Sequence, residues 1–316
     1  MNTASKLGGY GLMLGAAFAV ALGVGTAVGP VSATTTNTAT ASTHPGGGQD
    51  AQGMSGMTAT DYDAAGAHGM AGTGHAGGLP QGLAAAAGGY TLAPATTMLP
   101  TGRTAAFSFR VLGPDGTPLT AYTAEHEREL HFIVVGRDLI GYQHLHPTRS
   151  ADGTWSVPLT LPAAGVYKAF ADFRPVAASM PVTLAVDLFA PGDFRPAPLP
   201  KPVRTTTVDG YVVTLAGTPA AARESGLRFT VERDGRPVTD LQPYLGAYGH
   251  LVALRVGDLA YSHVHPDGAP GDGRTAPGPA VVFHADLPTA GAYRLFLDFQ
   301  TRGVVHTAAF TATAGR

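Results

Sequence analysis

The sequence contains the pattern Tyr-x-His-x-His-Pro twice, as YQHLHP at residues 142–147 and as YSHVHP at residues 261–266. A further histidine lies 13 residues before the first histidine of each copy. Imidazole nitrogen is a good ligand for copper and zinc ions, so three histidines that converge could hold one metal ion. The pattern therefore predicts two metal-ligand sets, one for each copy: His131, His144 and His146, and His250, His263 and His265.

A β-hairpin is the element that would bring each set together. Two apolar runs separated by a Gly/Asp/Arg turn lie between His131 and His144, and the second copy repeats this arrangement. With the turn centred on residues 137–138, His131 would lie directly across from His144, and His146 would follow on the same face. The prediction depends on this register, because a slip of one residue would turn His131 to the other face. The alternative is a polar cluster whose imidazoles are hydrogen-bonded to the backbone.

Aligned positions of the two copies suggest further residues that could bind the metal ion or orient its ligands. Met180 and His306 are equivalent, each seven residues after a phenylalanine that both copies share, and thioether and imidazole both suit copper. They are candidate fourth ligands, with copper as the expected ion and zinc as the alternative. Asp172 and Asp298 are also equivalent, and a buried carboxylate at this position could orient a ligand histidine or pair with a neighbouring cation.

The histidines lie in a segment with the features of tandem β-domains. From residue 85 onward, short alternating apolar runs separated by turn residues predict an all-β fold. The segment also repeats, because PDGTPLTAYTAEHERELHFIVVGRDLIGYQHLHP aligns without gaps with RDGRPVTDLQPYLGAYGHLVALRVGDLAYSHVHP. We predict two tandem Ig-like antiparallel β-sandwiches at residues 85–192 and 205–316, joined by a Pro-rich linker at 193–204. The Gly-x-Tyr steps at Tyr167 and Tyr293 resemble the tyrosine corner of such sandwiches.

The strands of the first domain can be placed individually. They are expected near these segments, the last divided in two: residues 89–94, 104–112, 118–121, 130–136, 139–146, 154–161 and 166–188. The second domain carries about seven extra residues in the Gly/Pro-rich segment DGAPGDGRTAPG, which should form a surface loop.

Two further segments precede the β-domains. Residues 1–33 hold one Lys before an uncharged apolar stretch that ends in Val-Ser-Ala, as expected for a signal peptide or for an uncleaved hydrophobic helix that anchors the chain in the membrane. In either case we expect the rest of the chain to be exported. Residues 34–84 are a low-complexity tail that we expect to be disordered. Its Met and His side chains are either incidental to a flexible stalk or additional copper ligands: Met54, Met57, His68, Met70 and His75.

The composition excludes several classes of protein. The net charge is −2 and no basic stripe offers a phosphate-binding surface, so nucleic acid is not an expected partner. The chain has no cysteine, which excludes disulfides, thiolate zinc sites and blue-copper centres. No nucleophile elbow, phosphate-binding loop or dinucleotide fingerprint occurs in the sequence, and we expect no enzymatic activity.

Three segments, ELHFIVVGRDLIGYQHLHP, LPAAGVYKAFADF and YLGAYGHLVALRVGDLAYSHVHP, resemble a largely uncharacterised family of exported actinobacterial proteins, usually called secreted or membrane proteins. The resemblance covers residues 85–316. It implies a two-domain β architecture and an extracytoplasmic location, and it carries no established activity. A Met/His tail ahead of an Ig-like domain is also loosely similar to periplasmic copper carriers, but none of their residues can be transferred by motif.

These features predict an exported metal-binding protein with one histidine site in each domain. Copper is the expected ion, and the protein would act as a buffer, carrier or resistance factor. Neutral imidazole is the ligand form, so binding should fade below about pH 6. The alternative is a non-catalytic cell-surface module whose histidines are polar packing and whose partner is another exported or membrane protein. Metal binding requires imidazole nitrogens within about 4 Å of one another, and polar packing does not.

Overall fold

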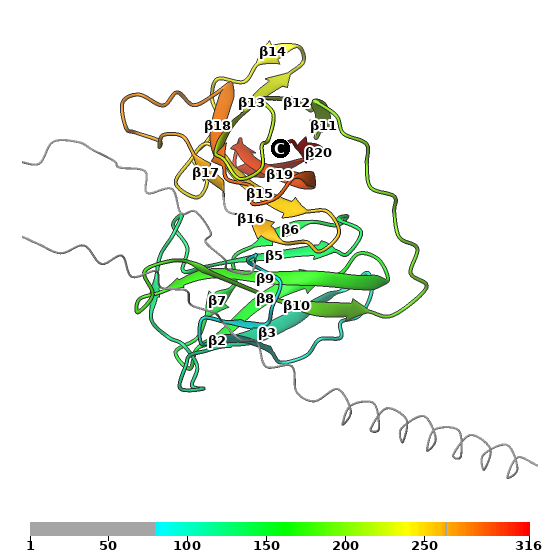
Figure 1. Ribbon diagram of the computed structural model, residues 1–316, viewed down its shortest axis with the longest axis vertical. Coiled ribbons are helices and arrows are strands. Elements are labelled where there is room, and N and C mark those ends of the chain that lie inside the picture. The colour runs from blue at the N-terminus through cyan, green and yellow to red at the C-terminus, as the bar shows by residue number, and fades with distance from the viewer. Residues whose placement is uncertain (1–79, 263) are drawn as a thin grey trace, which may run out of the picture. The chain divides into compact units, whose positions relative to one another are not determined.

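The structure is a computed structural model that describes residues 80–262 and 264–316. In these residues the chain forms two antiparallel β-sandwiches, one after the other along the sequence (Figure 1). This confirms the predicted all-β class with tandem Ig-like sandwiches. The expected leader at 1–33 and residues 34–79 of the expected tail lie outside the described residues. Within the described ranges, no helix is long and apolar enough to span a membrane.

The first sandwich consists of two sheets. One has the strand order β1-β2-β3-β8-β7, and the other has the order β10-β9-β5-β6, with the short β4 paired to β9. The strands have these bounds: β1 (Ala86–Ala87), β2 (Tyr90–Pro94), β3 (Thr104–Leu112), β4 (Tyr122–Thr123), β5 (Leu130–Gly136), β6 (Gln143–Leu145), β7 (Thr148–Arg149), β8 (Thr154–Thr160), β9 (Gly165–Pro175) and β10 (Val182–Ala190). The segment 118–121, expected to be a strand, instead precedes β4.

The second sandwich repeats this topology. Its sheets have the orders β11-β12-β13-β18-β17, with β14 paired to β13, and β16-β15-β19-β20. The strands have these bounds: β11 (Thr205–Val208), β12 (Tyr211–Ala216), β13 (Ser225–Arg233), β14 (Arg236–Pro237), β15 (His250–Arg255), β16 (Tyr261–Ser262), β17 (Val264–Pro266), β18 (Ala280–Ala285), β19 (Gly291–Thr301) and β20 (Val304–Ala314). The sheet that contains β5 and β9 is therefore equivalent to the sheet that contains β15 and β19.

Each sandwich encloses its own apolar core. Along β8, the buried side chains of Trp155, Val157 and Leu159 alternate with more exposed neighbours, as expected for a strand with one covered face. The indole N–H of Trp155 donates a hydrogen bond to the hydroxyl of Tyr122 at 3.1 Å, which satisfies the one polar group of this large ring. Local alternation of this kind is sufficient to place the inner faces of the sheets.

Tyrosine corners close both sandwiches as predicted. The hydroxyl of Tyr167 donates to the carbonyl oxygen of Ala163 at 2.9 Å. The hydroxyl of Tyr293 donates to the carbonyl oxygen of Thr289 at 3.0 Å. Each bond reaches back four residues along the chain, so the two repeats use the same device at the same place.

The strands β5, β9, β15 and β19 are buried on both faces, which is unusual in antiparallel sheets. One face of each strand belongs to the core of its own sandwich. The other faces, with neighbouring residues, form a third apolar cluster drawn from both sandwiches, here called the interdomain core: Ile133, Val135, Leu139, Phe170, Ala185, Val252, Leu254, Leu259, Tyr261 and Phe296. The ring of Tyr142 stacks on Phe296 beside it, with centroids 4.0 Å apart.

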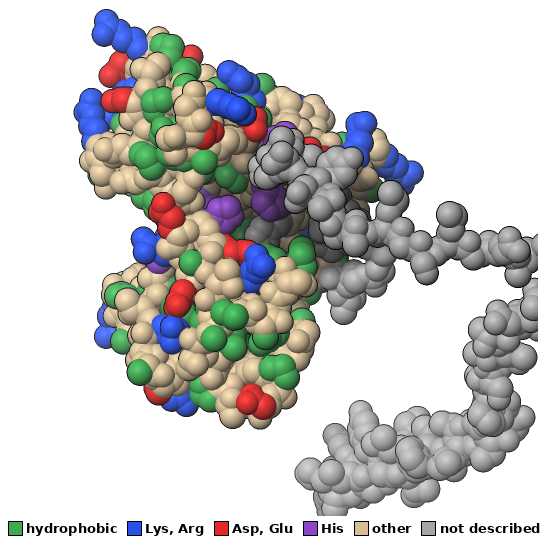
Figure 2. Space-filling view, turned by 90° about the vertical axis from the view of Figure 1, so that its left-hand side faces the viewer, with side chains coloured by type: hydrophobic (Ala, Val, Ile, Leu, Met, Phe, Trp, Pro, Cys, Tyr) green, Lys and Arg blue, Asp and Glu red, His purple; other side chains and the backbone are tan. Residues whose placement is uncertain are grey.

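Charged side chains of both signs are interspersed among neutral ones on the face seen in Figure 2. This distribution agrees with the net charge of −2. Histidine side chains, in purple, also reach the surface on this face.

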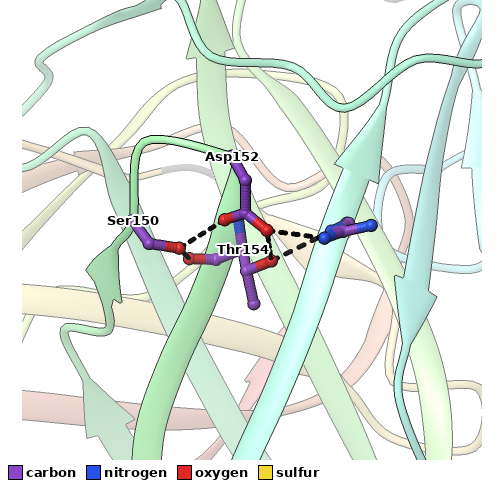
Figure 3. Close-up of polar contacts among 4 residues, drawn as sticks. Ser150, Asp152 and Thr154 are labelled. Carbon is purple, nitrogen blue, oxygen red and sulfur yellow. Dashed lines mark hydrogen bonds and ion pairs between the residues drawn. The ribbon is translucent and has the colours of Figure 1, made fainter.

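A network of polar side chains orders the turn between β7 and β8 (Figure 3). Asp152 accepts hydrogen bonds from the hydroxyl of Ser150 at 2.6 Å and from the backbone N–H of Thr154 at 3.1 Å. Arg110 on β3 adds an ion pair with Asp152 at 2.6 Å. These bonds favour the charged carboxylate and hold the pKa of Asp152 well below its usual range.

Substituting Asp152 by alanine is expected to lower Tm by about 2–4 °C, because the turn loses the acceptor that orders it. Since the folded pKa lies below the unfolded value, the contribution of the carboxylate is complete above about pH 5 and is progressively lost at lower pH. Thermal melts at pH 7 and pH 3 should therefore show a smaller difference between wild type and variant at pH 3. An equal difference at both pH values would contradict this assignment.

Candidate metal centre

The hairpin that carries the first histidine set has a different register from the one predicted. β5 ends at Gly136 and β6 begins at Gln143, so the connection is longer than a tight turn. Within it, Leu139 and Gly141 adopt left-handed backbone angles, with φ of 64° and 68°. As a result His144 lies opposite Ile133, two residues from its predicted partner His131. Because the slip is an even number of residues, the histidines stay on the predicted face.

That face is the outer face of the first sandwich. Along β5, Leu130 and Phe132 belong to the sandwich core, and His131 lies on the opposite face with Ile133. His250 begins β15 and occupies the equivalent place in the second sandwich. The rings of His131 and His250 stack with centroids 5.5 Å apart and planes 17° apart. The histidine group therefore includes residues of both repeats.

Three histidines among the described residues are close enough to hold one metal ion: His131, His144 and His250. One ring nitrogen of each lies within 4.8 Å of the others. Nδ1 of His131 is 3.1 Å from Nε2 of His144, and the ring centroids of His144 and His250 are 4.7 Å apart. His131 is 4% exposed and the side chain of His144 is 3% exposed, so these two rings are shielded from bulk water, and His250 is partly buried.

The other ring nitrogens of His131 and His144 face groups that can only accept hydrogen bonds. Nε2 of His131 is 3.0 Å from the carbonyl oxygen of Glu125, so His131 carries a proton on Nε2. Nδ1 of His144 is 2.9 Å from the carboxylate of Asp298, so His144 donates from Nδ1. When both rings are neutral, the two nitrogens that face each other at 3.1 Å therefore carry no proton, and each presents a lone pair to the other. Two lone pairs at this distance repel, so the pair favours a cation between them, either a metal ion or a proton.

A metal ion fits this pair of nitrogens. With metal–nitrogen bonds of about 2.0–2.1 Å, the 3.1 Å separation corresponds to a bond angle of about 98° at the metal. This angle lies between the roughly 90° of a square-planar site and the roughly 109° of a tetrahedral site. Both copper and zinc are compatible with the pair. His250 adds a third imidazole from the second sandwich, with a ring nitrogen within 4.8 Å of this pair.

His146 lies beside the three-histidine group. Its ring centroid is 4.8 Å from that of His144 and 5.4 Å from that of His131. Its Nε2 is buried and has no hydrogen-bond partner within the described part of the chain. Burial and the neighbouring His144 lower the pKa of His146 to about 3, so the ring is neutral at physiological pH and keeps a lone pair. His146 is therefore a candidate fourth ligand.

The two residues that the sequence suggested as fourth ligands are placed differently. Met180 is 52% exposed, in contrast to the buried histidine group. His306 is engaged through both ring nitrogens, with Nδ1 2.8 Å from Asp209 and Nε2 3.1 Å from the hydroxyl of Thr301. Neither residue belongs to the three-histidine group.

Only two members of the second predicted set, His250 and His265, lie among the described residues, so this set stays a prediction. His250 joins the histidines of the first repeat, and His265 is exposed on β17. In the second repeat the chain leaves the sheet of β15 after Ser262, whereas in the first repeat β6 continues to Leu145. His265 lies opposite His284 in the sheet of β18. The remaining predicted ligands lie outside the described residues: His263, Met54, Met57, His68, Met70 and His75.

Residues 85–188 and 206–316 match the family described as Domain of unknown function (DUF8832). The chain belongs to the DUF8832 family. The two matched segments correspond to the two sandwiches, so the DUF8832 region contains every member of the three-histidine group. No curated protein matches the DUF8832 chain.

Solved structures similar to the DUF8832 chain include FdeC, an Escherichia coli adhesin, at 16% identity and a TM-score of 0.24. InvD of Yersinia pseudotuberculosis has 16% identity and a TM-score of 0.23. The matches cover 71% and 72% of this chain, and 64% and 58% of the FdeC and InvD chains, so the protein spans less than two thirds of either. With TM-scores this low, the fold assignment follows from the strand pairing alone.

The two carboxylates that the sequence suggested as supporting residues both contact the opposite repeat of the DUF8832 chain. Asp298 accepts from Nδ1 of His144, and its second oxygen accepts from the hydroxyl of Thr307 at 2.6 Å. Asp172 accepts from the hydroxyl of Tyr261 at 3.3 Å. Asp298 thus orients a histidine that lies 154 residues away in the sequence, a partnership that spacing within one repeat cannot reveal.

Burial makes the first histidine of the group difficult to protonate. Burial and the neighbouring His144 lower the pKa of His131 to about 4. In the unfolded chain a histidine has a pKa of about 6.5. Between about pH 6.5 and pH 4 the unfolded chain therefore binds more protons at this residue than the folded protein does, and stability falls as the pH drops.

We expect His131 to lower the free energy of unfolding of the DUF8832 chain by about 2 kcal/mol between pH 7 and pH 5. Urea denaturation at both pH values in metal-free buffer measures the change. The His131→Asn variant should lose this part of the pH dependence. His284→Asn, which replaces a partly exposed histidine, should retain it. An identical pH dependence in wild type and His131→Asn would contradict the assignment.

Proposed function

We propose that this protein is an exported copper-binding protein with one metal site shared by its two β-sandwiches. The observation that carries the proposal is the pair of ring nitrogens of His131 and His144, which face each other at 3.1 Å while their other nitrogens face fixed acceptors. His250 supplies a third imidazole from the second sandwich. His146 is the proposed fourth ligand. Export follows from the predicted leader at residues 1–33.

The chemistry of the donors favours copper over zinc. The nearby donors are imidazoles, and the chain has no thiolate. At a site of this kind Cu(II) binds more tightly than the other divalent ions of the first transition row. Zinc remains the alternative ion, and a competition titration separates the two.

The burial of the site favours a buffer or resistance role over rapid transfer of the ion. His131 is 4% exposed, and the side chain of Asp298, which holds His144, is 1% exposed. An ion at this site could leave only when the ligand side chains or the interdomain contact move. Exchange should therefore be slow compared with exchange at an exposed site.

Titration of the full chain with Cu(II), followed by EPR, tests the proposal. The wild type should bind one equivalent tightly at this site, with nitrogen hyperfine structure from the imidazoles. The His144→Ala variant should lose that equivalent, and the control variant His284→Ala should keep it. If His144→Ala binds as much Cu(II) as the wild type, with the same spectrum, the histidine group is not the site.

The second candidate function is the non-catalytic surface module, in which a proton takes the place of the metal. A doubly protonated His144 would donate to both Asp298 and His131, so the same distances are compatible with polar packing. In that case the group should bind no Cu(II) at neutral pH, and the EPR spectrum should be the same with and without His144. The titration above therefore distinguishes the two functions.

A further inference from the structure

A cavity of about 490 Å³ opens at the end of the second sandwich and shares no lining residue with the three-histidine group. Its volume is in the range of small-molecule sites. The polar and charged side chains that line the cavity include Tyr211, Arg233, Arg236, Asp240, Thr301 and Arg302.

Three arginines line this cavity, and strand pairing places two of them next to each other. Arg233 ends β13 and Arg236 begins β14, and the two residues are directly opposite each other in the ladder. Like charges in directly opposite positions destabilise a strand pair. Arg302 approaches from the turn between β19 and β20, where its φ is 50°. A bound counter-charge would relieve the repulsion between these guanidinium groups.

The carboxylates at the cavity do not balance the arginines. Asp234 and Asp240 also line it, so two carboxylates accompany three guanidinium groups. Asp234 approaches Arg233 only to 4.0 Å, and its side chain is 91% exposed. An exposed pair of this kind contributes little. The cavity therefore has an excess of positive charge that attracts anions.

A chain of hydrogen bonds beneath the cavity holds Arg233 in place. Its guanidinium lies 4.8 Å from the ring centroid of Tyr211 and donates to the hydroxyl of Tyr211 at 2.8 Å. That hydroxyl is 2.6 Å from the hydroxyl of Thr301, which is 3.1 Å from Nε2 of His306. Nδ1 of His306 is 2.8 Å from Asp209, which can only accept. When His306 is neutral it donates to Asp209 through Nδ1, Thr301 donates to Nε2 of His306, and Tyr211 donates to Thr301.

This direction of donation leaves the Tyr211 oxygen as an acceptor for Arg233, so the guanidinium is oriented before any ligand arrives. An arginine has five N–H donors, and the contact with Tyr211 uses one of them. A preorganised guanidinium loses less entropy when it binds a ligand. These hydrogen bonds also give His306 a structural role that does not involve a metal.

We propose that this cavity is a binding site for a small oxyanion, a ligand that carries a carboxylate or a phosphate group, held by Arg233, Arg236 and Arg302. Guanidinium groups match the planar oxygen pairs of carboxylates and phosphates with two parallel hydrogen bonds.

Calorimetric titration of the metal-free full chain with inorganic phosphate and with citrate tests the proposal. We expect the wild type to bind at least one of the two, more weakly as salt is added. Arg236→Gln should weaken binding by about tenfold or more, because a charged hydrogen-bonding partner is lost. Arg103→Gln removes the same charge from an exposed position in the first sandwich and should bind as the wild type does. Absence of binding to both anions, or equal losses in the two variants, would overturn the proposal.

A second variant tests the positioning role of the hydrogen-bonded chain without a change of charge. Thr301→Val removes the hydroxyl that accepts from Tyr211 and should weaken anion binding severalfold, and Thr301→Ser should restore it. Cu(II) titration of Arg236→Gln should give the wild-type result, which separates this site from the histidine group. If Thr301→Val and wild type bind the anion equally, the hydrogen bonds through Tyr211 and Thr301 do not position Arg233.

Discussion

Replacing His250 by alanine is expected to weaken Cu(II) binding by about tenfold or more and to remove most of the thermal stabilisation that Cu(II) confers. His250 belongs to the second sandwich and His131 and His144 belong to the first, so a bound ion would join the two. An ion that binds only the folded protein stabilises it by about 2.7 kcal/mol at a free concentration about 100 times Kd. In a chain of this size the increase in Tm should be about 5–10 °C.

Thermal melts with and without Cu(II), together with a competition titration, measure these effects, and His265→Ala is the matched control. If each repeat bound its own ion, as the sequence spacing predicts, loss of His265 would be as damaging as loss of His250. With a shared site, His265→Ala should bind Cu(II) as the wild type does, because His265 is exposed on β17. A larger loss in His265→Ala than in His250→Ala would rule out the shared site.

The sequence predicted a strand correctly where one face of the strand is buried and the other faces solvent, because apolar and polar residues then alternate. The segments 104–112 and 154–161 became β3 and β8 almost without change, because alternation of apolar and polar residues identifies the inner face of a sheet locally. The segment 139–146 was shortened to β6. Its first residue, Leu139, has a left-handed backbone angle that leucine rarely adopts, so its residue type gave no sign that the connection continues past Asp138.

The histidine group was predictable only in part, because its third member depends on how the two sandwiches meet. His131, His144 and His146 were expected together, and the even register slip kept them on one face. The sequence of β5 does contain a sign of the contact between the two sandwiches. LHFIVVG is apolar on both faces of the strand, so both faces must pack against other parts of the protein. Since His131 and His250 occupy equivalent positions on such strands, contact between the two outer faces brings equivalent histidines together.

Replacing Phe296 by alanine is expected to cost about 3–5 kcal/mol of unfolding free energy and to weaken Cu(II) binding as well. Phe296 is 3% exposed in the interdomain core, and its ring stacks on Tyr142 with centroids 4.0 Å apart. Tyr142 lies two residues before His144, so loss of the Phe296 ring loosens the contact that places His144 against Asp298. Urea denaturation measures the first effect, and Cu(II) titration of the folded variant measures the second.

Phe229→Ala separates loss of stability from loss of the interdomain contact. Phe229 is fully buried in the core of the second sandwich, so its replacement should cost a similar free energy of unfolding and leave the affinity of the folded protein for Cu(II) unchanged. Wild-type Cu(II) affinity in both variants would mean that the interdomain core does not position the histidines. If Phe296→Ala alone loses affinity, the coupling must also act in reverse, because linkage between binding and docking is reciprocal. Cu(II) should then stabilise the contact between the two sandwiches in the wild type.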